Sequence, residues 1–182
     1  MSQLTANRPR SGPRATVGRA GPPPFQRFLD THRDLVWRFL VSSIGRADAE
    51  DCFQETFIAA LRAYPRLRAD SNLKAWVLTI AHRKALDSHR ARARRALPVA
   101  EIAEVADRDG RDASAGSPVS TRDETLWHAV RELPDRQRSA VVLRFIGDLP
   151  HRDIAAAIGC SEEAARRSLH EGLTRLRKEV TT

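Results

Sequence analysis

The sequence predicts an all-α fold made of two small helical domains joined by a flexible linker, and three observations carry this prediction. Apolar residues recur every three or four positions along most of the 182-residue chain, which is the spacing of one helix face. Residues 96–120 interrupt this pattern with Pro, Gly and acidic residues, as a mobile linker does. Near the C-terminus two periodic segments flank Gly159, an arrangement typical of a helix-turn-helix.

Composition limits the classes of protein that the chain can belong to. The net charge of +8 and the pI of about 10.8 favour an anionic polymer as partner. The two cysteines, Cys52 and Cys160, lie far apart and form neither a disulfide framework nor a zinc-ligand spacing. No apolar run approaches the length of a membrane span, and no signal-peptide core follows the N-terminus. We therefore expect a soluble cytoplasmic protein without a metal or cofactor.

The first segment, residues 1–24, is expected to be a disordered basic tail. It carries four arginines among Pro, Gly, Ser and Thr, and its apolar surface is too small to offset the entropy lost on ordering. The tail could attract phosphates weakly or could be an inert extension. From Phe25 the apolar spacing predicts a helix, and Gly45 is expected to end it.

A second helix is predicted to open at Asp48, with Asp51 three residues later in an arrangement like a capping box. Its apolar face is assigned to the core and consists of Phe53, Phe57, Ala60, Leu61 and Tyr64. The opposite face consists of Asp51, Gln54, Glu55 and Ile58. Such a face is usually solvated surface, but Ile58 among polar neighbours also fits a docking site for another protein. Pro65 is expected to end this helix.

A third, strongly basic helix is predicted from about Leu73 to Arg95, after a basic loop over 65–72. One stripe of it combines an aromatic ring with three arginines, namely Trp76, Arg83, Arg90 and Arg94. Rings stack on bases and guanidinium groups pair with phosphates, so the stripe fits unstacked nucleic acid. Alternatively Trp76 belongs to the core and the arginines face solvent. Six cations against one acid between residues 83 and 95 would repel one another, which favours nucleic-acid contact.

The segment 121–182 is predicted to form the second domain. One helix should begin near Thr121, another should run from about Asp135 to Phe145, and Gly147 should lead into the helix-turn-helix. The inward face of that motif consists of Ile154, Ala155, Ile158, Leu169, Leu173 and Leu176. Gly159 suits the left-handed turn, and Ser161 is expected to cap the helix that follows. The pattern by itself fits an ordinary helical hairpin equally well.

Three segments, taken in order, resemble the bacterial extracytoplasmic-function sigma factors of the sigma-70 class. They are DAEDCFQETF (48–57), LKAWVLTIAHRKALD (73–87) with its basic end, and LPDRQRSAVVLRF followed by DIAAAIGCS and a leucine (133–169). The resemblance covers 25–95 and about 121–178. It implies a sigma factor that binds core RNA polymerase and directs promoter recognition, minus-ten melting and transcription initiation, without covalent chemistry. An anti-sigma factor is a further partner expected from the family.

The resemblance also implies which residues bind. Core polymerase would contact Asp51, Gln54, Glu55 and Ile58. The minus-ten element would be bound and opened by Arg66, Arg68, Asn72, Trp76, Arg83, Lys84, Arg90 and Arg94. The minus-35 element would receive the second helix of the helix-turn-helix in its major groove, through Ser161, Arg166, Arg167, His170 and Arg175. The acidic linker would thread toward the RNA path of the polymerase.

The sequence departs from the family pattern at the start of the recognition helix. Glu163, Ala164 and Ala165 stand where Gly-Thr-Val is usual, so Ala165 replaces a larger packing residue. Glu162 and Glu163 would repel phosphates unless they accept from a cytosine amino group or serve the helix N-terminus, and the second role is preferred. Arg83 replaces a common Asn. These departures affect the target sequence more than the function.

Two other classes of function are weaker interpretations. A stand-alone helix-turn-helix repressor or activator would leave the polar face of the second helix and the charge layout of the two domains unexplained. An enzyme would need a reactive cluster, yet the six histidines are scattered and no Gly-rich phosphate loop or nucleophile motif accompanies them. We therefore expect two separate halves that bind opposite ends of one promoter. A structure that hides both the cationic helix and the helix-turn-helix would contradict this.

Overall fold

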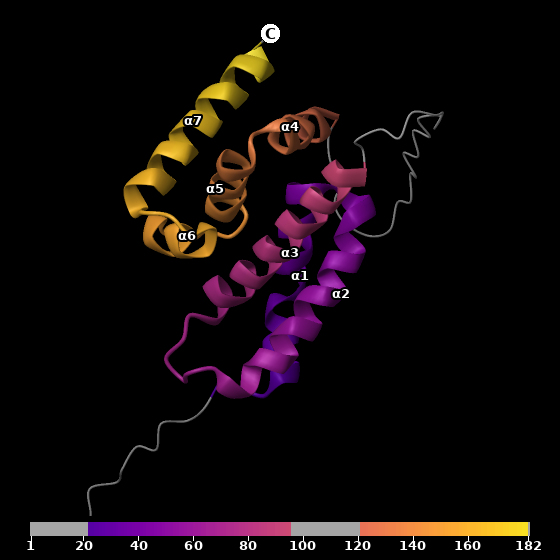
Figure 1. The fold of residues 1–182 in the computed structure, drawn as a ribbon, viewed down its shortest axis with the longest axis vertical. Coiled ribbons are helices and arrows are strands. Elements are labelled where there is room, and N and C mark those ends of the chain that lie inside the picture. Colours follow the sequence, from indigo (N-terminus) through magenta and orange to yellow (C-terminus); the bar gives the residue numbers. More distant parts are fainter. Residues whose placement is uncertain (1–21, 96–120, 182) are drawn as a thin grey trace, which may run out of the picture.

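The computed structural model describes residues 22–95 and 121–181, and all regular structure in these two ranges is helical (Figure 1). The elements are α1 (Phe25–Ile44), α2 (Arg46–Ala63), the short 3-10 helix η1 (Tyr64–Arg66), α3 (Leu73–Arg95), α4 (Thr121–Glu132), α5 (Asp135–Phe145), α6 (His151–Ile158) and α7 (Glu162–Thr181). The all-α prediction is confirmed. The predictions for the tail up to residue 21 and for the linker 96–120 lie outside the described residues.

Most helix ends fall where the sequence places them. Gly45 separates α1 from α2 with a φ of +83°, a backbone conformation that glycine adopts without strain. The capping-box prediction at Asp48 is wrong, because α2 already begins at Arg46 and Gly45 is its N-cap residue. The Asp48 carboxylate instead accepts a hydrogen bond from Arg92 of α3 at 3.3 Å. Asp48 therefore joins two helices and does not start one.

The first domain consists of α1, α2 and α3, packed side by side around an apolar core (Figure 1). Its centre is an aromatic cluster whose ring centroids lie 5.1–6.0 Å apart, formed by Phe25, Phe28, Tyr64 and Trp76. The Tyr64 hydroxyl also donates to the Pro23 carbonyl at 2.6 Å and so fixes the start of α1. The assignment of Leu61 to the core is wrong, since its side chain is 54% exposed. Cys52 and Thr56 fill the core positions of α2 instead.

The second domain consists of α4 to α7, with α7 lying across α5 and α6 (Figure 1). Gly159 ends α6 in the left-handed conformation, with φ of +70° and ψ of 45°, as predicted for the turn. The Ser161 hydroxyl accepts a hydrogen bond from the Ala164 N–H at 3.2 Å, which confirms the predicted N-cap of α7. Ile154 and Leu169, from the two helices of the motif, are both buried.

The two domains pack against each other. α5 and α6 contact α3, while α4 and α5 contact α1, so that one apolar cluster runs through both domains. Leu78 of α3 is fully buried, and a Cβ placed on Gly147 would lie only 2.9 Å from its Cδ1 atom. The expectation of two separate halves therefore does not describe this arrangement. The packing does not hide the two candidate DNA-binding surfaces. Arg83 and Arg90 of α3 and the N-terminal turn of α7 remain exposed.

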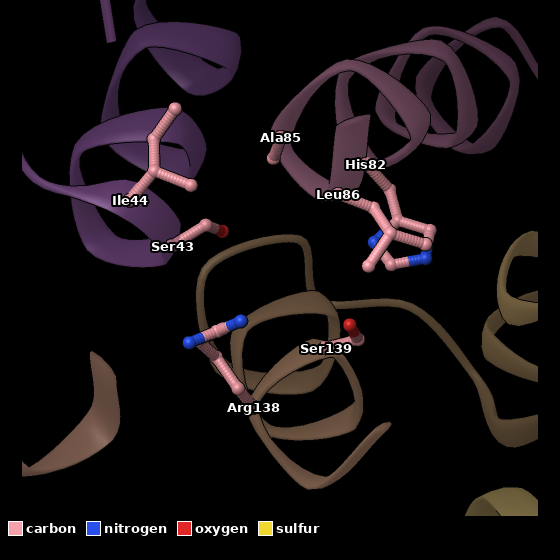
Figure 2. A pocket seen from close by; sticks show the side chains of 7 residues that line it. All are labelled: Ser43, Ile44, His82, Ala85, Leu86, Arg138 and Ser139. Atoms are coloured by element: carbon pink, nitrogen blue, oxygen red, sulfur yellow. The ribbon is translucent and has the colours of Figure 1, made fainter. Parts of the chain in front are cut away.

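A small pocket marks the junction of α1, α3 and α5 (Figure 2). It is lined by Ser43, Ile44, His82, Ala85, Leu86, Arg138 and Ser139. The Arg138 side chain is 7% exposed, and its guanidinium donates to the Arg131 carbonyl and to the Asp135 carboxylate. Burial, followed by the charge of Arg83, lowers the pKa of His82 from 6.5 to about 4. The junction therefore holds a neutral imidazole beside a buried guanidinium.

Acidification is expected to weaken this junction. The unfolded chain binds a proton at His82 below about pH 6.5, whereas the folded protein resists that proton until about pH 4. The stability that depends on a neutral His82 is therefore complete above pH 6.5. Below that pH the free energy of unfolding decreases, by up to about 1.4 kcal/mol for each pH unit. Urea unfolding between pH 7 and pH 4.5 measures the slope. His82→Gln should reduce it, and the exposed His128→Gln should not; equal slopes in both variants would contradict the assignment.

Candidate nucleic-acid interface

The cations of α3 divide into two groups. Arg83, Arg90 and Arg94 are exposed. Lys84 instead donates to the Glu55 carboxylate of α2 at 2.9 Å, and Arg92 forms an ion pair with Asp48, also of α2, at 3.3 Å. The exposed group offers guanidinium groups to solvent or to phosphates. The second group fastens α3 to α2.

The loop before α3 brings several predicted residues to one end of the first domain. Arg66 ends η1 and is exposed, while Arg68 forms an ion pair with Asp70 at 3.1 Å. The hydrogen bond from Arg68 lowers the pKa of the Asp70 carboxyl. The Asn72 Oδ1 atom accepts the Ala75 N–H at 3.2 Å, while its Nδ2 atom donates to the Asp153 carboxylate of α6 at 3.1 Å. Asn72 is thus in contact with the second domain.

Trp76 lies one turn into α3 and is partly buried. Its ring packs 5.6 Å from Phe28 and 6.0 Å from Tyr64, measured between ring centroids, so it belongs to the edge of the aromatic cluster. The remaining part of the ring is accessible. Both interpretations made from the sequence, a core residue and a base-contacting residue, fit this position.

The outer face of α2 carries acidic, amide and apolar groups together. Asp51, Gln54 and Glu55 are exposed, and Ile58 is 49% exposed. Leu61 lies three residues after Ile58, so the two apolar side chains are neighbours on this face. Sequence reasoning missed Leu61 because it also fits the apolar pattern of the core face. The second exposed apolar residue makes solvation alone a poorer explanation of this face.

The recognition-helix candidates lie along the exposed side of α7. Arg166 donates to Glu162 at 2.6 Å and Arg167 donates to Glu163 at 3.2 Å, each across one helical turn. The two arginine side chains are 64% and 67% exposed. His170 and Arg175 are exposed further along the helix. Glu162 and Glu163 lie in the first turn, as a role at the helix N-terminus requires, and they also orient the two arginines.

Removing the Ser161 hydroxyl is expected to destabilise the start of α7. Ser161→Ala leaves the Ala164 N–H without its acceptor, and the loss of such a cap costs about 1 kcal/mol. Urea unfolding of the full chain gives the change in free energy. Ser161→Asp, which also caps, should keep most of the stability. A stability loss in the Asp variant equal to that in the Ala variant would show that the cap is not the cause.

Other kinds of chemistry find little support in the residues that the structure describes. No group of three or more His, Cys, Asp or Glu there is placed to hold a metal ion. Burial raises the pKa of the Cys52 thiol, which lies 3.7 Å from the Lys84 carbonyl. Nor does any helix in those ranges have the length and apolar character needed to cross a bilayer.

Two family models match the chain, one on each domain. Sigma-70 region 2 matches residues 28–95, and Sigma-70 region 4 matches residues 123–176. The first therefore ends with α3 and the second contains the helix-turn-helix. Both sets of candidate DNA-binding residues thus lie within or beside segments that resemble sigma-factor regions.

Relatives and solved structures agree with these matches. The chain is 32% identical to the ECF RNA polymerase sigma factor SigD of Mycobacterium tuberculosis over 161 residues, covering 84% of this chain and 74% of SigD. It is 27% identical to SigX of Bacillus subtilis, covering 86% and 83%. The fold is similar to that of RpoE from Bartonella quintana, solved with the anti-sigma factor NepR, with a TM-score of 0.67, 24% identity and coverage of 87% and 97%. The chain belongs to the extracytoplasmic-function sigma factors, the promoter-recognition subunits of RNA polymerase.

Proposed function

We propose that three separate surfaces of the chain carry out this function. The α2 face of Asp51, Gln54, Glu55, Ile58 and Leu61 binds core RNA polymerase. The loop at 65–72 and the exposed stripe of α3 bind and open the minus-ten element. The N-terminal half of α7 enters the major groove of the minus-35 element. The observation that carries the proposal is that exposed arginines lie on α3 and on α7, at the ends of the two segments that match sigma regions.

Transcription with purified core polymerase tests the proposal as a whole. Run-off transcription on a library of candidate promoters should give defined start sites only when the chain is added. A stand-alone repressor or activator would instead bind a duplex operator tightly without polymerase. Promoter-specific transcripts with weak duplex binding by the free chain support the sigma function, and the reverse result contradicts it.

Substitutions on the proposed polymerase-binding face of α2 should weaken polymerase binding. Changing Asp51, Gln54 and Glu55 to Ala removes two charges and an amide from an exposed face, so polymerase affinity should fall about tenfold or more while the helical circular dichroism stays constant. Leu61→Ser should weaken binding by several-fold, because an exposed apolar contact is lost. Competition against a labelled sigma factor for core polymerase measures both effects. Asp87→Ala on α3 is the control for charge, and unchanged affinity in the triple variant would remove this face from the proposal.

The minus-ten surface combines stacking with phosphate contacts. An extruded base costs a few kcal/mol of unstacking and regains about 1–3 kcal/mol by stacking on a ring. The accessible edge of Trp76 supports such stacking near the loop, and Arg83 and Arg90 are exposed along the same helix. Lys84, already paired with Glu55, would contribute less than the exposed arginines. No covalent step is part of this proposal.

An anti-sigma factor is the proposed regulator. RpoE, which has a similar fold, was solved in complex with the anti-sigma factor NepR, and CnrH was solved in complex with the cytosolic domain of CnrY. CnrH has a TM-score of 0.59 with this chain, at 19% identity and with 85% of each chain covered. We place the chain in the cytoplasm, where RNA polymerase acts, and the acidic segment 96–120 in the RNA path of the polymerase.

A further inference from the structure

The Tyr64 side chain fixes the point at which the N-terminal segment joins the first domain. Its hydroxyl donates to the Pro23 carbonyl at 2.6 Å, and its ring packs edge-on against Phe25, with centroids 5.2 Å apart. The Phe28 N–H donates to the Pro24 carbonyl at 3.1 Å. Tyr64 is buried, so this attachment is part of the aromatic core. The segment before residue 22 is therefore joined to the domain at one defined place.

This attachment point lies beside the proposed minus-ten surface. The Tyr64 ring is 6.0 Å from the Trp76 ring, measured between centroids, and Tyr64 is the first residue of η1, which leads into the loop before α3. The start of α1 and that loop lie at the same end of the first domain (Figure 1). One side chain thus contacts both the attachment point and the residue proposed to stack on an opened base.

Positive charge gathers around the attachment point. Residues 1–21 contain no acidic residue and four arginines, namely Arg8, Arg10, Arg14 and Arg19. Residues 56–69, on either side of Tyr64, contain three more arginines and again no acidic residue. One of the three, Arg66, is exposed two residues after Tyr64. Like charges on the segment and on the domain repel one another, and a row of phosphates between them would relieve that repulsion.

The carboxylates closest in sequence to Tyr64 and Pro23 already have partners. Each accepts from a neighbouring side chain: Glu55 from Lys84 at 2.9 Å, Asp70 from Arg68 at 3.1 Å, and Asp30 from Gln26 at 3.0 Å. An arginine of the N-terminal segment would have to break one of these contacts to pair with the domain. An external anion is therefore the better partner for the segment.

The length of the chain limits how far these arginines can reach. A fully extended chain spans at most about 3.6 Å for each residue. Arg19 therefore lies within about 14 Å of Pro23, and Arg14 within about 32 Å, whatever path the chain takes. A single strand of duplex DNA carries one phosphate for each 3.4 Å of its axis. Several phosphates beside a base that is stacked on Trp76 thus lie within reach.

Resting on the proposed function, we propose that residues 8–19 are a further DNA-binding segment: Arg14 and Arg19, tethered through Pro23 to Tyr64, contact the phosphates beside the opened minus-ten bases. Trp76 holds an opened base, and the segment holds the backbone next to it. Contacts to phosphates carry no sequence information. The segment therefore adds affinity and leaves the choice of promoter to the other surfaces.

The salt dependence of binding to a fluorescent single-stranded dT20 tests these contacts with the full chain. Each phosphate contact to a single strand contributes about 0.7 to the slope of log affinity against log salt. Arg14→Gln/Arg19→Gln should therefore make the slope shallower by about 1.4 and lower the affinity roughly tenfold at 0.1 M salt. Arg14→Lys/Arg19→Lys keeps both charges, so it should keep the slope and bind within about twofold of the unmodified chain.

Arg38→Gln/Arg136→Gln is the matched control for net charge. It also lowers the charge of the chain from +8 to +6, but by removing exposed arginines of α1 and α5. Its slope should change by less than about 0.4. Equal changes in this control and in Arg14→Gln/Arg19→Gln would show that total charge is responsible. An unchanged slope in Arg14→Gln/Arg19→Gln would show that the segment is inert, and either result overturns the proposal.

Tyr64→Phe tests the tether, because it keeps the ring and removes only the hydroxyl that donates to Pro23. In the unmodified chain it should weaken dT20 binding by about two- to fivefold. In the Arg14→Gln/Arg19→Gln background the same change should cost less than about 1.5-fold, since the contacts that it positions are gone. Equal losses in the two backgrounds would overturn the placement of the segment beside Trp76.

Two other outcomes remain distinct from these. If the segment binds a protein surface of the polymerase, Arg14→Gln/Arg19→Gln loses affinity for core polymerase while its dT20 slope stays unchanged, which overturns the DNA assignment. If the proposed function is wrong, the unmodified chain gives no promoter-specific transcripts with core polymerase, whatever the dT20 slopes. If both proposals hold, run-off transcription by Arg14→Gln/Arg19→Gln falls several-fold at low salt, and the deficit shrinks as the salt concentration rises.

Discussion

Replacing both Arg166 and Arg167 by Ala should reduce initiation at promoters with an intact upstream element by roughly 30-fold or more. Each bidentate contact between an arginine and a base is worth about 1–3 kcal/mol, and both guanidinium groups are exposed at the start of α7. Run-off transcription with core polymerase, at fixed salt, measures the effect. Arg136→Ala, which removes an exposed charge from α5, should change initiation by less than about twofold.

The same experiment on a promoter with a scrambled upstream element separates recognition from general weakening. On the scrambled promoter, the Arg166→Ala/Arg167→Ala variant should initiate almost as well as the unmodified chain, because neither protein can make the contacts to the upstream element. Glu162 and Glu163 currently pair with these arginines, so part of each base contact replaces an existing ion pair of modest value. Equal losses on both promoters would show that α7 does not read the upstream element.

Phe28→Ala is expected to destabilise the first domain strongly, by about 3–5 kcal/mol. Phe28 is 1% exposed, and its ring lies at the centre of the aromatic cluster, with centroids 5.1–6.4 Å from those of Phe25, Phe57, Tyr64 and Trp76. Removing the ring leaves a cavity that four neighbours cannot fill without moving. Urea unfolding, followed by tryptophan fluorescence, gives the free energy. The fluorescence of Trp76 should also respond, since its ring loses a contact.

An aromatic residue of the same type provides the control. Phe145 is 59% exposed at the end of α5, so Phe145→Ala should change stability by no more than about 0.5 kcal/mol. Phe28→Leu, which refills part of the cavity, should lose less than Phe28→Ala. A similar loss in Phe28→Ala and Phe145→Ala would contradict the burial assigned to Phe28.

The local features of the fold could be predicted because they depend on neighbouring residues. The bounds of α3, the left-handed Gly159 and the Ser161 cap follow from apolar spacing and from the chemistry of helix ends. Two errors have local causes as well. Leu61 fits the apolar pattern of a core face that Cys52 and Thr56 in fact fill, and Gly45 replaces Asp48 as the N-cap because the preceding helix ends there.

The packing between the domains could not be predicted in this way. Leu78 of α3 is fully buried, but no local pattern indicates that Gly147, nearly 70 residues later, lies against it. The contact between Asn72, just before α3, and Asp153, in the first turn of α6, joins residues 81 positions apart, and the local sequence around neither residue indicates it. Charge density marks α3 as the basic helix of the first domain, yet it could not separate Lys84, paired with α2, from the exposed arginines beside it. Such distinctions depend on which elements meet.

The link between Glu55 and Lys84 has a thermodynamic consequence. One carboxylate at the proposed polymerase face holds one ammonium of the proposed DNA helix, with side chains 59% and 32% exposed. A protein that binds the Glu55 carboxylate would break its ion pair with Lys84 and leave the ammonium free to bind a polyanion. By linkage, a polyanion bound at Lys84 would raise the affinity for a protein at Glu55 by the same factor. An exposed pair of this kind is worth at most about 1 kcal/mol. The two ligands would then cooperate by no more than about fivefold, in whichever order they arrive.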